Sequence, residues 1–125
     1  MIIAPLPSNE TDRLQALYSY KILDTEAEDE YDQLTQAASL ICQAPIALIS
    51  LIDKKRQWFK SKQGVKAPEF SRDLSVCSHA ILNAPEPTVI EDGTKDPRFF
   101  DNPLVCAKHL LQNRPLWLDS PAYRE

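Results

Sequence analysis

The first part of the chain has a hydrophobic pattern typical of an amphipathic helix. Leu14, Leu17 and Tyr18 fall on one face at helical spacing. Asn9 precedes this pattern and is a residue type that caps helices, and the acidic residues after it favour the positive end of the helix dipole. The pattern therefore predicts a helix from residue 10 to near residue 20.

A second and longer apolar stripe predicts a second helix. Thr25 and Glu28 stand three residues apart, which is the spacing of a capping box at a helix N-terminus. Pro45 disfavours helical geometry in the residue before it, so the helix ends by residue 44. The residues of this stripe, which we expect to face the core, are Ala27, Tyr31, Leu34, Ala38 and Ile41.

Residues 45–62 form the most informative pattern, a predicted β-hairpin. Residues 46–52 are apolar and branched on both faces, as in a strand that is covered from two sides. A charged turn with Lys54, Lys55 and Arg56 follows, and the return strand then alternates bulky and polar side chains. We expect the first strand to be buried and the second to be partly exposed.

Shorter elements are predicted after the hairpin. Residues 76–84 form a short helix capped by Ser75, and residues 88–91 form a strand that ends at the turn of Asp92 and Gly93. Residues 96–103 combine aromatic residues with prolines, which suits a loop packed over a site. Beyond it the pattern allows one more short helix, and no strand pattern follows residue 91.

Composition and charge narrow the class of protein. A chain of 125 residues with 43% hydrophobic and 26% charged residues is large enough for one folded core. The formal net charge is −4 and no run of Lys and Arg exceeds three residues, so we expect no nucleic-acid partner. The longest apolar run is far below the roughly 20 residues of a membrane-spanning helix, and the first residues lack the features of a signal peptide. We therefore expect a cytoplasmic protein with no membrane partner.

Cysteines and histidines are the clearest candidates for chemistry. Three widely spaced cysteines, Cys42, Cys77 and Cys106, fit free thiols in a reducing compartment better than disulfides. Cys77 and His79 could form a nucleophile and base, or a metal pair, but residues two apart on a helix are rotated by about 200° and point to nearly opposite faces. Cys106 and His109 share a helical face, yet no second pair completes the four ligands of a structural zinc site. We interpret Cys77 as a core or pocket-lining thiol and expect no metal site.

Acidic and aromatic residues give no stronger sign of catalysis. Asp92, Asp96 and Asp101 could hold a metal or form an acid–base pair, but Asp92 precedes a glycine and Asp96 precedes a proline, where turns place aspartate. Trp58 and Phe59 are neighbours in a strand and point to opposite faces, so at least one belongs to the core. The sequence has no Gly-rich phosphate loop and no nucleophile elbow. We therefore expect a protein that is not an enzyme and has no catalytic residues.

Seven short motifs, taken together and in order, resemble the GAF sensory domain found at the N-terminal side of bacterial sensor histidine kinases and diguanylate cyclases. The motifs are ETDRL at 10–14, ILDT at 22–25, PIALISLID at 45–53, QWFKS at 57–61, SVCSHAI at 75–81, VIED at 89–92 and DPRF at 96–99. The resemblance divides the chain into an N-terminal extension (1–9), a partial GAF domain (10–105) and a divergent C-terminal tail (106–125).

The resemblance implies an α/β (α+β) fold, a GAF/PAS-like antiparallel sheet flanked by helices, with a cavity between the sheet and residues 75–99. Members of the family bind small molecules there, or serve as dimerising and signal-relaying modules in two-component and related signal transduction. The resemblance therefore implies a sensor with a small-molecule ligand. By position, its ligand-binding residues would be Trp58, Cys77, His79, Asp92, Asp96 and Phe99.

Two specialised branches of the family use cysteines. In bilin-binding members, the chromophore cysteine stands next to a histidine and lies further along the domain than Cys77, so the resemblance argues against a covalent bilin and identifies no other cofactor. Another branch reduces free methionine sulfoxide with several cysteines. Cys77 and Cys106 do not match the spacing of a resolving pair, and thiol-dependent methionine sulfoxide reduction is therefore the weaker alternative.

The chain departs from the family after residue 105, where members continue with two further strands. The resemblance then implies an incomplete sheet that lacks the last strands. Residues 46–52 would keep an unpaired edge, which favours a homodimer or other self-association. Our hypothesis is a truncated GAF domain that is small-molecule-binding, signal-relaying or a non-functional remnant. The alternative is an autonomous dimerising or interaction module in which the tail supplies the missing cover.

Overall fold

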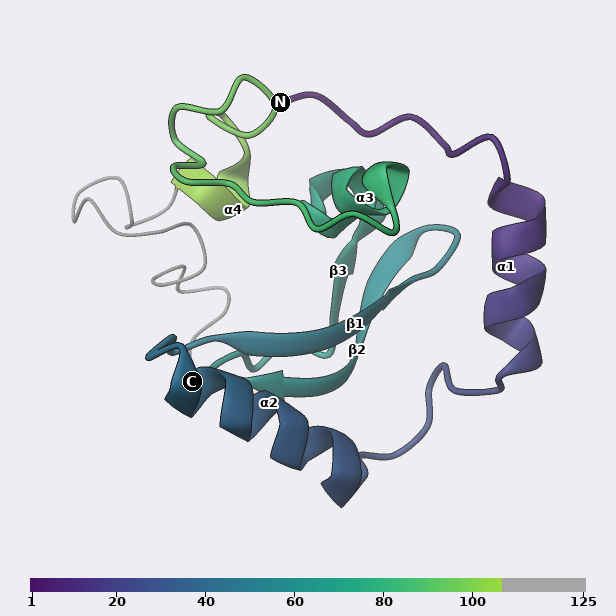
Figure 1. Ribbon diagram of the computed structural model, residues 1–125. Coiled ribbons are helices and arrows are strands. Elements are labelled where there is room, and N and C mark those ends of the chain that lie inside the picture. Colours follow the sequence, from purple (N-terminus) through teal and green to yellow (C-terminus); the bar gives the residue numbers. More distant parts are fainter. Residues whose placement is uncertain (107–125) are drawn as a thin grey trace.

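The computed structural model describes residues 1–106 and shows a mixed α and β fold (Figure 1), which confirms the predicted class. The predicted tail, including His109, lies outside the described residues except for Cys106. Within residues 1–106, no helix is long and apolar enough to cross a membrane. In chain order the elements are α1 Glu10–Ser19, α2 Asp29–Ile41, β1 Ala47–Ile52, β2 Arg56–Gln63, β3 Glu69–Ser71, the 3-10 helix η1 Arg72–Leu74, α3 Cys77–Ala80, the 3-10 helix η2 Ile81–Asn83 and α4 Pro103–Cys106.

The strands form an antiparallel sheet in the order β1-β2-β3 among the described residues. In Figure 1, α2 lies on one side of this sheet and α3 on the other, while α1 stands beside the end of the hairpin. The register of β1 against β2 shifts between Ile49 and Ser50 at an irregularity of the β-bulge type. Near this irregularity, Lys60 and Ser61 both reach residues of α2 or of the segment just before it. The sheet therefore presents polar side chains to α2.

The predicted hairpin forms, but the burial of its two strands is the reverse of the prediction. In β1 only Ile52 is buried, and the other five residues are half-buried. In β2, residues 57–61 are all buried. The physical reason is the strand order, because β2 lies between two neighbours, whereas β1 lies at the edge of the sheet that residues 1–106 form.

The second helix begins later than predicted and turns a different face to the sheet. Thr25 Oγ1 donates a hydrogen bond to the Ile22 carbonyl (2.5 Å), and Glu28 pairs with Lys60, so neither residue makes the predicted capping box. In the predicted apolar stripe, Leu34 is 61% exposed and Ile41 81% exposed. The buried residue of α2 is Thr35, because the strand beneath presents Ser61. The Oγ atoms of Thr35 and Ser61 are 2.9 Å apart, and Ser61 donates to Asp32 at 2.6 Å.

The other elements match the predictions in part. α1 forms with Leu17 buried, although the Asn9 side chain makes no capping bond. The predicted helix at residues 76–84 is confirmed as α3 followed by η2, and Ser75 Oγ accepts a hydrogen bond from Ser78 N at 3.1 Å. The predicted strand at 88–91 is wrong, since these residues have no strand geometry. The short strand β3 was not predicted, because its three residues are too few to show a period.

Lys60 is the most deeply buried cation of the sheet, with a side chain that is 0% exposed. Its Nζ lies 2.6 Å from a carboxylate oxygen of Glu28 and donates to Thr25 Oγ1 at 2.8 Å and to the Glu26 carbonyl at 2.6 Å. The ammonium also lies 5.5 Å from the centre of the Tyr31 ring. These partners compensate for the loss of water and fix the segment before α2 against β2.

A second set of charges, centred on the buried Arg72, attaches α1 to the hairpin turn. The Arg72 side chain, 8% exposed, pairs with both carboxylate oxygens of Glu10 and donates to the Asp53 carbonyl at 3.2 Å. Arg13 pairs with the same carboxylate and donates to the Ile52 carbonyl. The hydrogen bonds from Arg72, and then those from Arg13, lower the pKa of Glu10 from 4.5 to about 2. The folded state therefore strongly favours the charged form of Glu10.

Glu10→Gln tests this network. A carboxyl whose pKa is lower in the folded state stabilises the fold above its unfolded value of 4.5, and this contribution is lost as the pH falls towards about 2. We expect the variant to lose about 2 kcal/mol of unfolding free energy at pH 7, and the difference from wild type to shrink below about pH 4.5. Urea unfolding at a series of pH values measures both. Glu91→Gln, an exposed loop change, is the control, and an equal loss in both variants would contradict the network.

Candidate functional site

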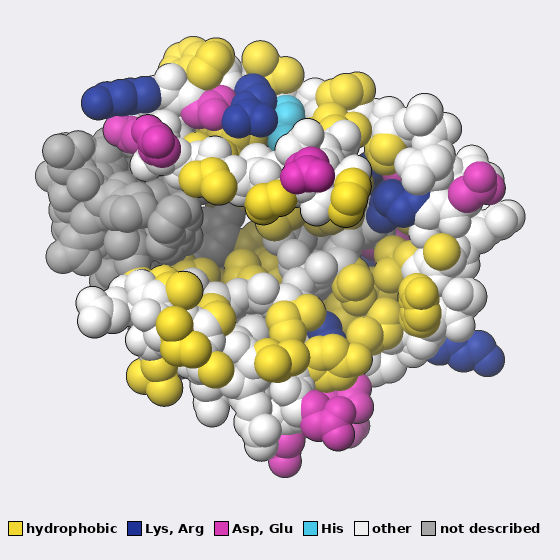
Figure 2. Space-filling model, viewed as in Figure 1, with side chains coloured by type: hydrophobic (Ala, Val, Ile, Leu, Met, Phe, Trp, Pro, Cys, Tyr) yellow, Lys and Arg dark blue, Asp and Glu magenta, His cyan; other side chains and the backbone are white. Residues whose placement is uncertain are grey.

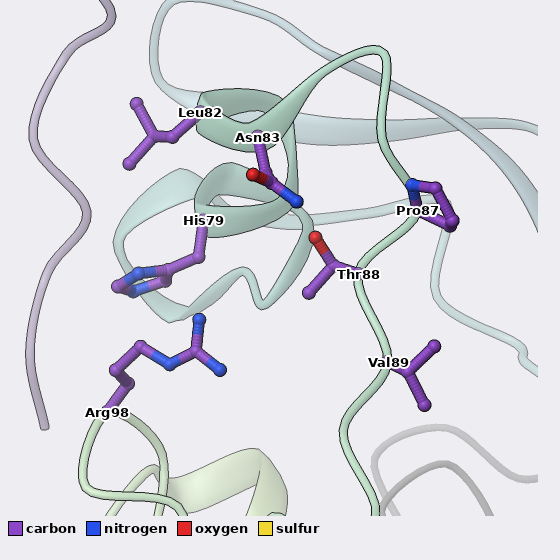
Figure 3. A pocket seen from close by; sticks show the side chains of 7 residues that line it. All are labelled: His79, Leu82, Asn83, Pro87, Thr88, Val89 and Arg98. Atoms are coloured by element: carbon purple, nitrogen blue, oxygen red, sulfur yellow. The ribbon is translucent and has the colours of Figure 1, made fainter.

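A pocket of about 530 Å³ opens between α3 with η2 on one side and the segment after η2 on the other (Figure 3). Arg98 closes one end of the space beside His79, as the sticks in Figure 3 show. Asn83 and Thr88 point towards one another across the pocket in the same view. The lining residues are His79, Leu82, Asn83, Pro87, Thr88, Val89 and Arg98.

Arg98 is held in a fixed orientation by its neighbours. Its Nε and Nη2 donate to the two carboxylate oxygens of Asp96 at 2.9 and 2.7 Å, and the guanidinium carbon lies 4.8 Å from the centre of the Phe99 ring. Asp96 Oδ1 also accepts from the Arg98 backbone N–H at 2.9 Å. Hydrogen bonds from Arg98 lower the pKa of Asp96, and those from Asp96 raise the pKa of Arg98. The pair is therefore ionised, with one edge of the guanidinium bound to Asp96.

His79 is held between the buried Phe99 and the N-terminal segment. The imidazole packs edge-on against the Phe99 ring, with 4.9 Å between the ring centres. Its Nε2 lies 2.9 Å from the Ile2 carbonyl, which fits a donated hydrogen bond. The Ile2 backbone N–H in turn donates to the Arg98 carbonyl at 3.2 Å. Residue 2 thus bonds to both sides of the pocket.

Hydrogen bonds to side chains of the sheet hold α3 in place. Ser75 Oγ donates to Gln57 Oε1 at 2.5 Å, and Gln57 Nε2 donates to Ser50 Oγ at 3.0 Å. Ser75, Gln57 and Ser78 are all buried. Buried polar groups of this kind are stable only when paired, so these contacts fix the start of α3 over β1 and β2.

One of the six predicted site residues, His79, lines this pocket, and two others contact residues that line it. The Phe99 ring packs against His79 and Arg98, and Asp96 pairs with Arg98. Asp92 lies apart in a turn, where it accepts hydrogen bonds from the backbone N–H and hydroxyl of Thr94. The turn interpretation of Asp92 and Asp96 therefore agrees with their hydrogen bonds.

Trp58 does not line the pocket. Its strand neighbour Gln57 contacts Ser75 before α3, and successive strand residues point to opposite faces, so Trp58 points away from α3. Trp58 is 7% exposed and Phe59 6% exposed, which places both in the core. The Phe59 ring packs edge-on against Phe70 at 4.9 Å between centres. Trp58 and Phe59 therefore contribute to packing on opposite faces of the sheet.

Cys77 faces the sheet and not the pocket. Burial raises the pKa of its thiol, and hydrogen bonds with Ser50 and Gln57 offset only part of this effect. A nucleophilic cysteine needs a lowered pKa, so this environment is unfavourable for thiol chemistry. Cys77 and His79 point to different partners, as the two-residue spacing predicts.

The sequence did not identify Arg98, Asn83 or Thr88 as site residues. Asp96 and Arg98 stand two residues apart around a proline, a spacing that permits a local ion pair, and this was the available signal for Arg98. Asn83 and Thr88 carry no comparable signal, because their approach depends on the path of the chain after η2. Within residues 1–106, no group of three or more His, Cys, Asp and Glu side chains is arranged to hold a metal ion.

Comparison with known proteins indicates a signalling context. No model of a known protein family matches the chain. Over 105 residues, 84% of the chain, the sequence is 37% identical to cyclic di-GMP phosphodiesterase PA2567 of Pseudomonas aeruginosa. The matched region is 18% of that protein, so the chain spans less than a fifth of this relative. The similarity supports a general role in bacterial signal transduction.

The same comparison corrects one prediction. We expected a protein that is not an enzyme, and this is wrong, because the relative to which most of the chain aligns is named as a phosphodiesterase. The resemblance implied a bacterial signalling protein, and the name of this relative agrees with that general class.

Alkylation of cysteines tests the environment of Cys77. In a Cys106→Ser background, we expect iodoacetamide to modify the exposed Cys42 at least about tenfold faster than Cys77 at pH 8, because burial disfavours the Cys77 thiolate. Peptide mass spectrometry measures the two rates. In urea the rates should become similar, which controls for local sequence effects. Equal rates in the folded protein would show that Cys77 is accessible and reactive.

Proposed function

We propose that the chain is a sensory module of the GAF type that binds a small molecule and acts in cyclic di-GMP signalling. The observation that carries this proposal is the similarity to a cyclic di-GMP phosphodiesterase over 84% of the chain. Because the match covers 18% of that relative, we assign to the chain the role of a module of such an enzyme. Detection of a ligand by the module would then set the phosphodiesterase activity.

The pocket supports the ligand-binding part of the proposal. It is lined by Leu82, Pro87 and Val89 together with polar residues, of which Asn83 and Thr88 point towards one another (Figure 3). Its volume of about 530 Å³ is in the usual range for small-molecule sites, and such sites combine an apolar lining with a few placed polar groups. The position of His79 and Phe99 at this pocket agrees with the sensory role that the motif resemblance implies.

The antiparallel sheet of residues 1–106, with helices on both sides, supports the GAF assignment. Its buried polar core between Gln57 and Ser75 gives α3 a fixed position, which a sensory module needs in order to hold a pocket. Cytoplasmic localisation, which fits free cysteines and an intracellular signalling enzyme, remains part of the proposal.

A chimera tests the proposed function. The 105 aligned residues of the phosphodiesterase relative are replaced by the matching residues of this chain. If the two segments are equivalent modules, the chimera should keep hydrolytic activity on cyclic di-GMP within about fivefold of the parent. Modules of one fold place their chain ends in the same positions, so the rest of the enzyme is not disturbed. Liquid chromatography of the reaction products measures the activity.

The matched control is the same chimera with Arg72→Gln. This change leaves Arg13 as the cationic partner of Glu10 and removes the contact with η1, and we expect it to lower activity well below that of the first chimera. A well-folded first chimera without activity would contradict the equivalence of the modules. Equal activity in both chimeras would show that the module does not influence the enzyme.

A dimerising module is the second candidate function, and the exposed apolar surface next to β1 supports it. Leu34, Leu40 and Ile41 of α2 are 61%, 79% and 81% exposed. In Figure 2, hydrophobic side chains gather over the region of α2 and the neighbouring sheet edge. β1 contains no charged residue and no proline, the features with which edge strands usually resist pairing, and within residues 1–106 it has a neighbour on one side. We therefore propose a second copy of this chain as the occupant, paired through β1.

Analytical ultracentrifugation tests this candidate. We expect wild type to form dimers with a dissociation constant on the order of micromolar, as for small interfaces. The double variant Leu40→Lys with Ile41→Lys should sediment as a monomer, since it places charges on the apolar face. Leu6→Lys, at a leucine that is 65% exposed outside α2, is the control and should still dimerise. Monomeric wild type at 100 µM would refute a dimer of this affinity.

A further inference from the structure

The nitrogen atoms of the Arg98 guanidinium differ in whether they have a hydrogen-bond partner. Arg98 uses Nε and Nη2 for Asp96, and among residues 1–106 its Nη1 has no hydrogen-bond acceptor. In Figure 3, the guanidinium end of Arg98 extends into the space between His79 and Thr88. The pocket therefore has a cationic hydrogen-bond donor at one end, with its donor group directed inwards.

The orientation of Arg98 is set before any ligand arrives. The bidentate contact with Asp96 fixes one edge of the guanidinium, and the Phe99 ring packs against it. Phe99 is itself 1% exposed, so this support is rigid. A donor that is already ordered loses little side-chain entropy when it binds an acceptor.

The charge balance around Arg98 favours an anion of modest affinity. Asp96 is ionised and offsets part of the positive charge, but both its oxygens already accept hydrogen bonds from Arg98. None of the other lining residues is acidic. An anion at Nη1 therefore accepts a hydrogen bond from a cation and is not repelled by an acidic lining residue. The negative charge of the neighbouring Asp96 limits its affinity.

We infer that the pocket binds the anionic group of a small amphipathic metabolite, a carboxylate or a phosphate, at Arg98. Nη1 of Arg98 would donate to the anion, with the Asn83 amide and the Thr88 hydroxyl as further donors. The apolar part of the ligand would lie along the pocket lining that includes Leu82 and the chain at residues 87–89. This inference rests on the proposed ligand-binding function and specifies its ligand class.

Titrations of the full chain followed by NMR test the inference. The probes are inorganic phosphate, butyrate and, as the uncharged match of butyrate, butyramide. We expect butyrate or phosphate to shift the Arg98 Nε–H resonance with a dissociation constant on the order of millimolar, and butyramide to bind at least about tenfold more weakly. The stronger of the two anions identifies a carboxylate or a phosphate as the ligand group.

Variants assign the effect to Arg98. Arg98→Gln should weaken anion binding at least about tenfold, as judged from the Thr88 and Asn83 amide shifts. Lys95→Gln removes a positive charge from a side chain that is 83% exposed and does not line the pocket, and it should bind like wild type. Thr88→Val keeps the pair of Arg98 and Asp96 intact and should weaken binding severalfold, which provides a test if Arg98→Gln disturbs the fold.

Three results would overturn the inference. They are equal binding of butyrate and butyramide, unchanged anion binding in both Arg98→Gln and Thr88→Val, and the absence of shifts with either anion up to about 50 mM, well above the millimolar affinity expected. None of these results would alter the activity of the phosphodiesterase chimera. Failure of the anion site and failure of the proposed signalling function are therefore separate outcomes.

Discussion

The ion pair between the half-buried Glu10 and the buried Arg72 is the interaction on which the rest of the structure depends. Arg72 lies at the start of η1, and its guanidinium contacts α1 through Glu10 and the hairpin turn through the carbonyls of Asp53 and Lys54. Its backbone N–H also donates to the Lys55 carbonyl at 3.0 Å. A buried cation is stable only with its full set of partners, so α1, the hairpin turn and η1 take their positions together.

The position of η1, fixed by Arg72, in turn determines the position of the pocket through a few consecutive residues and hydrogen bonds. η1 leads directly to Ser75, whose hydroxyl bonds to Gln57 of β2, and α3 follows with His79. The Leu74 carbonyl accepts a hydrogen bond from the buried Asn102 side chain at 3.0 Å, which ties the segment after Arg98 to the same place. The position of η1 therefore fixes both α3 and the segment after Arg98, although Arg98 and Glu10 are far apart in sequence.

Local periodicity in the sequence was sufficient for the helices and the hairpin, but not for burial. The pattern of residues 46–52 predicted a strand correctly, whereas its burial depends on strand order, which no local pattern contains. The pattern gave no sign that Lys60 is buried, because its partners Glu28 and Thr25 lie more than thirty positions away. The apolar stripe of α2 was predicted to face the core, and this failed for a similar reason, since Thr35 contacts Ser61 of a distant strand.

Some residues of the candidate site are marked by local motifs, and others depend on contacts between distant parts of the chain. His79 and Phe99 could be predicted because short motifs mark them, while Arg98 becomes a pocket residue only when residues 96–99 fold back beside α3. The hydrogen bonds that join the two walls directly run through the backbone of Ile2, a half-exposed residue at 52%. Such bonds open more readily than buried ion pairs. We therefore expect the spacing of His79 and Arg98 to be the adjustable part of a frame that Glu10 and Arg72 keep rigid, a combination that suits the proposed sensory role.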